Sequence, residues 1–167
     1  MLSNRFIVWY LITSLLIILS TAIVFAVIKP LGNNKCIRGN CKNGYGAYVY
    51  NSGMKYEGGW KNGKRYGKGT LTYPDGTKYE GEWKNDRMHG FGIKTSPVFR
   101  AYKYIGEWGN GLKHGKGIQY YAPDEWYDGE WRNGKIEGYG EFVVINRDGT
   151  IKRTKGIWKD EKLIKQF

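Results

Sequence analysis

The sequence has few aliphatic side chains beyond its first 28 residues. Only 17 Leu, Ile and Val occur among the 139 residues that follow Ile28. A helical bundle needs aliphatic stripes and a doubly wound enzyme fold needs continuous aliphatic strands, so both classes are excluded. Acidic residues are absent before Glu57, and the only ionisable side chain before residue 29, apart from tyrosine, is Arg5.

Glycine and aromatic residues take the place of the aliphatic ones. All 25 glycines lie between Gly32 and Gly156, about 18% of the residues after Ile28 against a usual 7%. The same stretch holds 23 of the 27 aromatic residues. So much glycine disfavours helices, and so many aromatics exclude a disordered chain. The composition therefore predicts a β protein that is built from repeats.

The amino-terminal segment has the character of a membrane span. Residues 6–28 form a run of 23 residues without a charge. As a helix this run is about 34 Å long, enough to cross a hydrocarbon core of about 30 Å. It is longer than a cleavable signal and is followed by no small-x-small site. We therefore predict a short tail at 1–5 and a retained signal anchor, one transmembrane helix, at 6–28.

The next segment, residues 29–55, is a basic juxtamembrane stretch with no acidic residue. Positive charges after the span favour a cytoplasmic repeat domain. They act either as topology determinants alone or also as contacts to anionic lipid headgroups, at about 1 kcal/mol per charge. No Asn-x-Ser/Thr glycosylation acceptor occurs in the chain. The basic residues of the stretch are Lys29, Lys35, Arg38, Lys42 and Lys55.

A five-residue motif recurs through the rest of the chain, and internal repeats decide the fold of such a sequence. Its pattern is Tyr-x-Gly-x-Trp, and a worn copy spans 154–158. A turn and a Gly-x-Gly sequence follow each full copy. The aromatic pairs are Tyr56 and Trp60, Tyr79 and Trp83, Tyr104 and Trp108, and Tyr127 and Trp131; the glycine pairs are Gly67 and Gly69, Gly90 and Gly92, Gly115 and Gly117, and Gly138 and Gly140.

One copy of the motif predicts one β-hairpin. Tyr, Gly and Trp at alternate positions lie on one face of a strand. The Asn-Gly pairs at 62–63, 110–111 and 133–134 are two-residue turn signals. Glycine within a strand often marks a close approach, so we expect the Gly-x-Gly glycines to make room for tryptophan rings. The predicted result is an antiparallel meander that grows by two strands per repeat.

The motif residues resemble MORN repeats, named for membrane occupation and recognition nexus. Besides Tyr-x-Gly-x-Trp and the turn, the match includes His-Gly-x-Gly at 89–92 and 114–117. The resemblance implies that 56–167 form an elongated, twisted, single-layer sheet of four full copies and a worn last copy. It also implies a role in protein association, scaffolding or membrane-proximal attachment. The sequence departs from the pattern at Asp86, which replaces a turn glycine.

Polar residues of the repeats do not form a convincing reactive site. His89 and His114 occupy equivalent positions 25 residues apart, which fits a packing role better than a metal site. Acidic residues recur on the face opposite Tyr and Trp, as a solvated face or, less favoured, a catalytic carboxylate pair. No catalytic residue, metal or cofactor is predicted, nucleic acid is not an expected partner, and the protein is predicted not to be an enzyme. The acidic residues are Glu80, Glu82, Glu107, Asp128 and Glu130.

Two interpretations apply to Cys36 and Cys41. If Cys41-Lys42-Asn43-Gly44 aligns with 60–63, a degenerate first repeat places Cys41 in a tryptophan position. A regular strand from 36 to 41 would then hold the two Cα atoms about 16 Å apart, too far for a disulfide. If residues 37–40 instead form a turn, a disulfide can close the loop. We favour the closed loop, which places the repeats on an oxidising, non-cytoplasmic face.

Two functions remain open at this point. The first is a membrane-anchored scaffold whose aromatic-glycine sheet face binds a protein, including a second copy of itself. The second is a module whose aromatic-glycine face holds glycan or lipid headgroups. A purely structural role in a cell envelope is a third interpretation. The sequence does not identify the partner.

Overall fold

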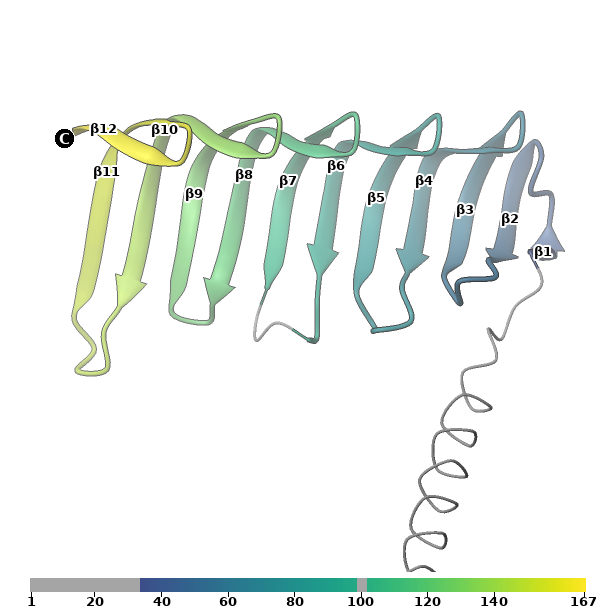
Figure 1. Cartoon of the computed structure of the whole chain (residues 1–167), viewed down its shortest axis with the longest axis horizontal. Coiled ribbons are helices and arrows are strands. Elements are labelled where there is room, and N and C mark those ends of the chain that lie inside the picture. Colours follow the sequence, from purple (N-terminus) through teal and green to yellow (C-terminus); the bar gives the residue numbers. More distant parts are fainter. Residues whose placement is uncertain (1–33, 99–101) are drawn as a thin grey trace, which may run out of the picture. The chain divides into compact units, whose positions relative to one another are not determined.

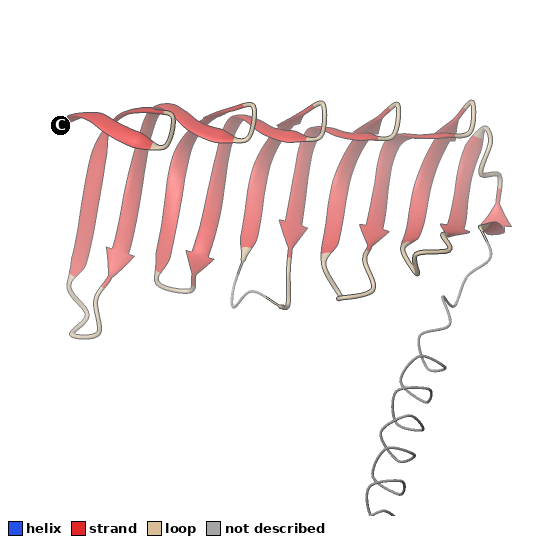
Figure 2. Ribbon diagram, viewed as in Figure 1, coloured by secondary structure: helices blue, strands red, loops and turns tan. Residues whose placement is uncertain are grey.

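The computed structural model describes residues 34–98 and 102–167, which form one antiparallel sheet of 12 strands (Figure 1). The strands pair in sequence order. Figure 2 shows strands and loops along these residues, and none of them belongs to a helix that could cross a bilayer. The predicted span 6–28 lies outside the described residues. The strands are β1 (Lys35–Gly39), β2 (Gly44–Val49), β3 (Lys55–Lys61), β4 (Lys64–Thr72), β5 (Lys78–Lys84), β6 (Arg87–Thr95), β7 (Lys103–Gly109), β8 (Leu112–Ala122), β9 (Glu125–Arg132), β10 (Lys135–Ile145), β11 (Ile151–Lys159) and β12 (Lys162–Gln166).

This topology confirms the predicted all-β meander with two strands per repeat. Each motif tyrosine and tryptophan lies on the first strand of a hairpin, and each Gly-x-Gly lies on the second. The hairpin turns use residues with positive φ, as two-residue turns require. Asn85 and Asp86 adopt φ of 51° and 67° without any glycine. The Asp86 Oδ1 accepts hydrogen bonds from the backbone N–H and the Nε of Arg65, which holds this turn in place.

A row of glycines crosses the sheet at its centre. Gly58 pairs with Gly46 on one side and with Gly69 on the other, and the same pairing continues strand by strand to Gly156. The row has no side chains, so it forms a channel on the sheet surface. Its members are Gly39, Gly46, Gly58, Gly69, Gly81, Gly92, Gly106, Gly117, Gly129, Gly140 and Gly156.

The motif tyrosines lie in this channel. A Cβ placed on Gly117 would stand 2.6 Å from the Cζ of Tyr104, and Gly92 has the same relation to Tyr79. The expectation that these glycines make room for tryptophan rings is therefore wrong. The tyrosine of the same hairpin takes that space. Alternation along one strand shows which side chains share a face, but not which ring of the partner strand lies over a glycine.

The motif tryptophans pack beside the same channel and donate hydrogen bonds to its glycine carbonyls. Trp108 Nε1 donates a 3.2 Å hydrogen bond to the carbonyl of Gly92, on the preceding strand. The Trp108 ring stands edge-to-face against Tyr79 and Tyr104, with centroids 5.3 and 5.0 Å apart. This geometry is favourable for aromatic pairs. The arrangement repeats along the sheet as one continuous ladder of rings: Trp60, Tyr56, Trp83, Tyr79, Trp108, Tyr104, Trp131, Tyr127 and Trp158.

Side chains from the hairpin tips cover the ladder. Arg65 and Lys113, each paired with a motif tryptophan across the turn, lie over the tryptophan ring of the next repeat. The Arg65 guanidinium stands 4.3 Å above the Trp83 ring, and the Lys113 ammonium stands 4.2 Å above Trp131. Such contacts combine a cation–π attraction with packing of the aliphatic stem. Burial lowers the pKa of Lys113 to about 8, with a further contribution from Lys94.

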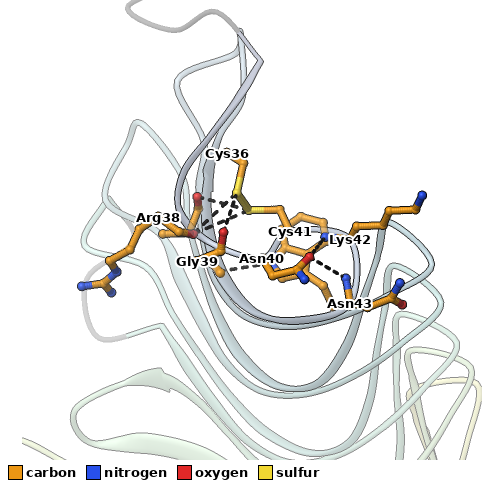
Figure 3. The surroundings of a disulfide bond; sticks show 10 residues. Cys36, Arg38, Gly39, Asn40, Cys41, Lys42 and Asn43 are labelled. Carbon is orange, nitrogen blue, oxygen red and sulfur yellow. Dashed lines mark hydrogen bonds between the residues drawn. A yellow bond between two sulfur atoms is a disulfide. The ribbon is translucent and has the colours of Figure 1, made fainter.

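The first hairpin is built differently, because a disulfide joins Cys36 and Cys41 with their Cα atoms 5.9 Å apart (Figure 3). β1 runs to Gly39, and a bulge between Cys36 and Arg38 interrupts its register. Asn40 begins the turn, and its Oδ1 accepts hydrogen bonds from the backbone N–H groups of Lys42 and Asn43. The turn therefore lies after Gly39 and not at 37–40. The loop closed by a disulfide is nevertheless present, and the alternative of a regular strand from 36 to 41 is not.

The proposed alignment of this hairpin with the later repeats, in which Gly39 takes the place of Gly58, holds at Gly39, which pairs with Gly46 as Gly58 pairs with Gly69, but it is wrong in register from Cys41 onward. Gly44 pairs with Trp60, as Gly67 pairs with Trp83 in the next repeat, so Gly44 opens a Gly-x-Gly and does not occupy a turn position. Cys41 is likewise not a substitute for tryptophan. A Cβ on Gly46 would meet the Cys41 Sγ at 2.9 Å, where later repeats present a tyrosine.

The ladder generates a stability prediction. Trp108→Ala should cost about 3–5 kcal/mol of unfolding free energy, because its ring is buried between two tyrosines. Gly117→Val should destabilise by about 1–3 kcal/mol or more, since its side chain would enter the space of the Tyr104 ring. Lys116→Ala, a neighbouring exposed position, is the control and should stay within about 0.5 kcal/mol. Denaturant melts measure all three; an unchanged midpoint for Trp108→Ala would contradict the ladder.

The disulfide generates a second prediction. In the native, unreduced protein Cys36 and Cys41 should resist alkylation, because both sulfurs are bonded to each other. After reduction and unfolding, two alkyl groups should be added, as measured by intact mass. Cys36→Ser is the control, since it should leave one reactive thiol without reductant. Two alkylated thiols in unreduced wild-type protein would show that the bond is absent.

Candidate functional site

The face that carries the motif residues is not an accessible surface. The four motif tyrosines are at most 1% exposed, and the motif tryptophans Trp60, Trp83, Trp108 and Trp131 are between 3% and 7% exposed. Each tyrosine hydroxyl donates to a backbone carbonyl three residues later, for example from Tyr104 to Glu107 at 3.0 Å. Burial raises the pKa of Tyr56, Tyr79, Tyr104 and Tyr127 well above the usual value, so these phenols stay protonated. These rings therefore present almost no surface to a partner or ligand, in contrast to what both functional hypotheses assumed.

The opposite face, which we call the outer face, is exposed. Its central row contains the middle residue of each Gly-x-Gly, on β2, β4, β6, β8 and β10. Aromatic residues and lysines alternate along it. The exposed fractions of Tyr45, Phe91 and Tyr139 are 60%, 55% and 51%. Lys68 and Lys116 occupy the equivalent positions between them.

Acidic residues of the outer face have a structural role. The carboxylates of Glu82, Glu107 and Glu130 accept hydrogen bonds from the backbone N–H groups that follow Gly90, Gly115 and Gly138. These three glycines have positive φ, of 56°, 58° and 104°, and sit where the strand register shifts. These acids therefore fix a bulge in three of the four repeats, and the first repeat has Gly59 at the equivalent position. All three side chains remain exposed, which agrees with the favoured interpretation of a solvated face, and each has this structural role in addition.

His89 and His114 stay apart on separate hairpins, β5–β6 and β7–β8. Across residues 34–98 and 102–167, no group of three His, Cys, Asp or Glu side chains is close enough to hold a metal ion. His89 pairs with Glu82 across its hairpin, at the edge of the bulge. Neither histidine contributes to a site that the described residues form.

Two equivalent grooves lie on the outer face, two repeats apart. The larger one, of about 440 Å³, extends between Tyr45 and Phe91. The smaller one, of about 250 Å³, is bordered by Tyr139. Each combines a lysine, two acids and an aromatic ring at matching repeat positions. In the larger groove these residues are Lys68, Glu80, Glu82 and Phe91, and in the smaller one Lys116, Asp128, Glu130 and Tyr139.

An apolar strip lies between the two grooves, and its first residue, Ile93, also lines the larger one. Ile93, Ile105 and Ile118 are direct cross-strand neighbours on β6, β7 and β8, and each is partly exposed. Acids occupy the same row on either side, with Glu80 on β5 and Asp128 on β9. Together with Phe91, the strip gives the outer face an apolar centre with charged flanks. Such a composition is typical of a binding surface.

The sequence interpretation missed these outer-face residues. The available signal was the middle position of Gly-x-Gly, which reads Tyr45, Lys68, Phe91, Lys116 and Tyr139 in successive repeats. If the repeat fold required one residue type at this position, aromatic residues and lysines would not alternate there. The glycines and rings of the motif dominated the pattern, and they belong to the buried face.

Comparison with known proteins supports the repeat assignment. The family model described as the MORN repeat matches residues 56–78, 79–98, 104–124 and 127–143. No curated protein matches the chain. The matched segments coincide with the four hairpins that begin at β3, β5, β7 and β9. The chain therefore contains four MORN repeats.

Proposed function

We propose that this protein is a membrane-anchored, non-enzymatic scaffold that binds a protein partner through the outer face of its sheet. MORN repeats generally serve association with proteins or membranes, which supports the class of function. One observation carries the choice of surface. Phe91, Tyr45 and Tyr139 are exposed at positions where the same fold accepts Lys68 and Lys116. Folding does not require rings there, so a binding role explains them.

The surroundings of these rings support a protein partner. The apolar strip of Ile93, Ile105 and Ile118 adds area beside Phe91, and charged residues lie around it. Interfaces commonly have an apolar centre with a polar rim, and aromatic anchors carry much of their binding energy. A second copy of this chain is one candidate for the protein partner.

A glycan is the second candidate, favoured by the larger groove. Its acids have basic neighbours: Arg38 forms an ion pair with Glu57, and Lys78 forms one with Glu80 at 3.1 Å. The groove is thus close to neutral, with fixed donors and acceptors beside two exposed rings. That chemistry suits a hydroxyl-rich neutral polymer as well as a polypeptide.

The anchor and the side of the membrane belong to the same proposal. Residues 6–28 would hold the chain in the bilayer, and the disulfide of Cys36 and Cys41 favours an oxidising, non-cytoplasmic location for the sheet. The juxtamembrane lysines argue for the opposite side. The disulfide is the stronger argument, because large domains translocate largely regardless of charge.

Membrane retention is tested by alkaline carbonate extraction. We expect the full-length protein to stay in the membrane pellet, because residues 6–28 offer 23 uncharged residues to the bilayer. A variant lacking 6–28 is the control and should appear in the supernatant. Recovery of wild-type protein in the supernatant with a mature terminus after residue 28 would refute the anchor.

The binding surface is tested by site-directed photo-crosslinking in native membranes. A crosslinking residue at position 91 should give one discrete product of higher mass, because Phe91 lies at the centre of the proposed interface. The same residue at position 147, in an exposed turn, is the control and should give none. Tyr45→Lys with Tyr139→Lys should abolish the product at 91 without changing the melting midpoint, because lysine is native at the equivalent positions.

Mass spectrometry of the product then decides between the candidates. A polypeptide, including a second copy of the chain, supports the protein scaffold. A carbohydrate adduct supports the glycan candidate instead. Equal products at positions 91 and 147, or none at 91, would contradict a binding role for the outer face.

A further inference from the structure

We propose that the hairpin tips at the amino-terminal end of the sheet form a binding site for a linear polyanion. The tips lie side by side along one edge of the sheet (Figure 1). Consecutive tips are joined, since the second turn residue donates its N–H to the preceding hairpin, as Gly63 does to Lys42. Tips two strands apart are spaced by about 10 Å. This edge is distinct from the outer face and does not depend on the function proposed for it.

Basic residues concentrate on the first three tips. Five exposed cations flank the turns of the β1–β2, β3–β4 and β5–β6 hairpins. Within the described residues, none of the five forms an ion pair. Three tips span about 20 Å, so the five charges stand close together. We call this set the basic tip cluster, and its members are Lys42, Lys61, Lys64, Lys84 and Arg87.

The acid nearest to the cluster does not neutralise it. Asp86 lies in the turn between Lys84 and Arg87, but its carboxylate is bonded to Arg65. Arg65 is not a member of the cluster, because its guanidinium lies over the rings of the ladder. These two charges cancel each other, and the five cations of the cluster keep their full charge.

Folding does not require these cations. The equivalent positions of the β7–β8 hairpin are Gly109 and Leu112, and its turn keeps the same geometry, with φ of 53° at Asn110 and 89° at Gly111. Five unpaired like charges raise the free energy of the folded sheet through repulsion. A bound polyanion would relieve that repulsion, which gives the cluster a physical reason to bind one.

The carboxyl-terminal tips provide an internal comparison. Arg132, Lys135, Lys159 and Lys162 flank the last two turns. Here acids pair with two of the four, since Glu137 contacts Arg132 at 3.3 Å and Asp160 contacts Lys135 at 2.7 Å. Glu161 adds a third acid in the same turn. A flat anionic surface placed along this edge would meet both groups of tips, whereas a flexible linear polymer can select the amino-terminal group, in which none of the five cations forms an ion pair.

The cluster selects by charge spacing and not by the shape of one anionic group. Four of its five members are lysines, whose ammonium groups act as point charges with rotatable donors. A chain of repeated anionic groups, such as a phosphodiester or phosphoanhydride polymer, can follow the tips. Such binding should weaken steeply with salt, because counterions are released from the polymer.

The test uses the full-length chain in a non-ionic detergent and fluorescent inorganic polyphosphate as the probe, with binding followed by anisotropy. One variant combines Lys61→Gln, Lys64→Gln, Lys84→Gln and Arg87→Gln. The control combines Arg132→Gln, Lys135→Gln, Lys159→Gln and Lys162→Gln, which changes the net charge by the same amount. Equal melting midpoints of both variants and wild type confirm that folding is intact.

We expect the first variant to bind at least about tenfold more weakly and the control to bind within about twofold of wild type. The slope of log affinity against log salt should fall by up to about 3 in the first variant, at about 0.7 per lost charge. Equal weakening of both variants would show attraction to net charge alone and overturn the site. No binding of polyphosphate by wild type would overturn it as well.

Discussion

The contact between a tyrosine ring and a glycine of the paired strand is the interaction on which the sheet depends. A single-layer sheet has no second layer to bury its apolar face, so it must make a core from its own side chains. The glycine row provides space at the sheet surface, and Tyr79 or Tyr104 fills that space against Gly92 or Gly117. The tryptophans then pack between successive tyrosines, and the bulge that Glu82 or Glu107 holds turns the hairpin tip over the rings.

The two ends of the array meet this requirement by different means. At the start, the disulfide loop brings the Cys41 sulfur to Gly46, where a tyrosine would otherwise lie. At the end, Leu163 of β12 contacts Gly156, and Trp158 still donates to the carbonyl of Gly140. Terminal repeats lack a neighbour on one side, so they need their own way to close the core. A covalent bond at one end and an aliphatic side chain at the other both replace a ring.

Much of this fold could be predicted from the sequence, because the motif residues determine turns and strand faces locally. Asn62 and Gly63 specify a turn with positive φ, and Tyr56 with Trp60 specify one face of a strand. The partner of each glycine could not be predicted, since it depends on register across the hairpin and on the bulge at Gly67. The turn of the first hairpin was predicted wrongly for the same reason. Asn43 and Gly44 look like a turn signal, yet Gly44 pairs with Trp60 as part of the next strand.

The positions that the ladder leaves free are the ones that distinguish this chain from a generic array. The ladder needs Tyr, Gly and Trp, and it needs a Glu or a substitute for the bulge. It places no demand on the middle residue of Gly-x-Gly or on the residues that flank a turn, as Phe91 against Lys116 and Lys64 against Leu112 illustrate. Buried repeat residues are therefore uniform because packing constrains them, whereas exposed ones can vary from repeat to repeat. Departures from the repeat at exposed positions are thus the more informative guide to what this sheet binds.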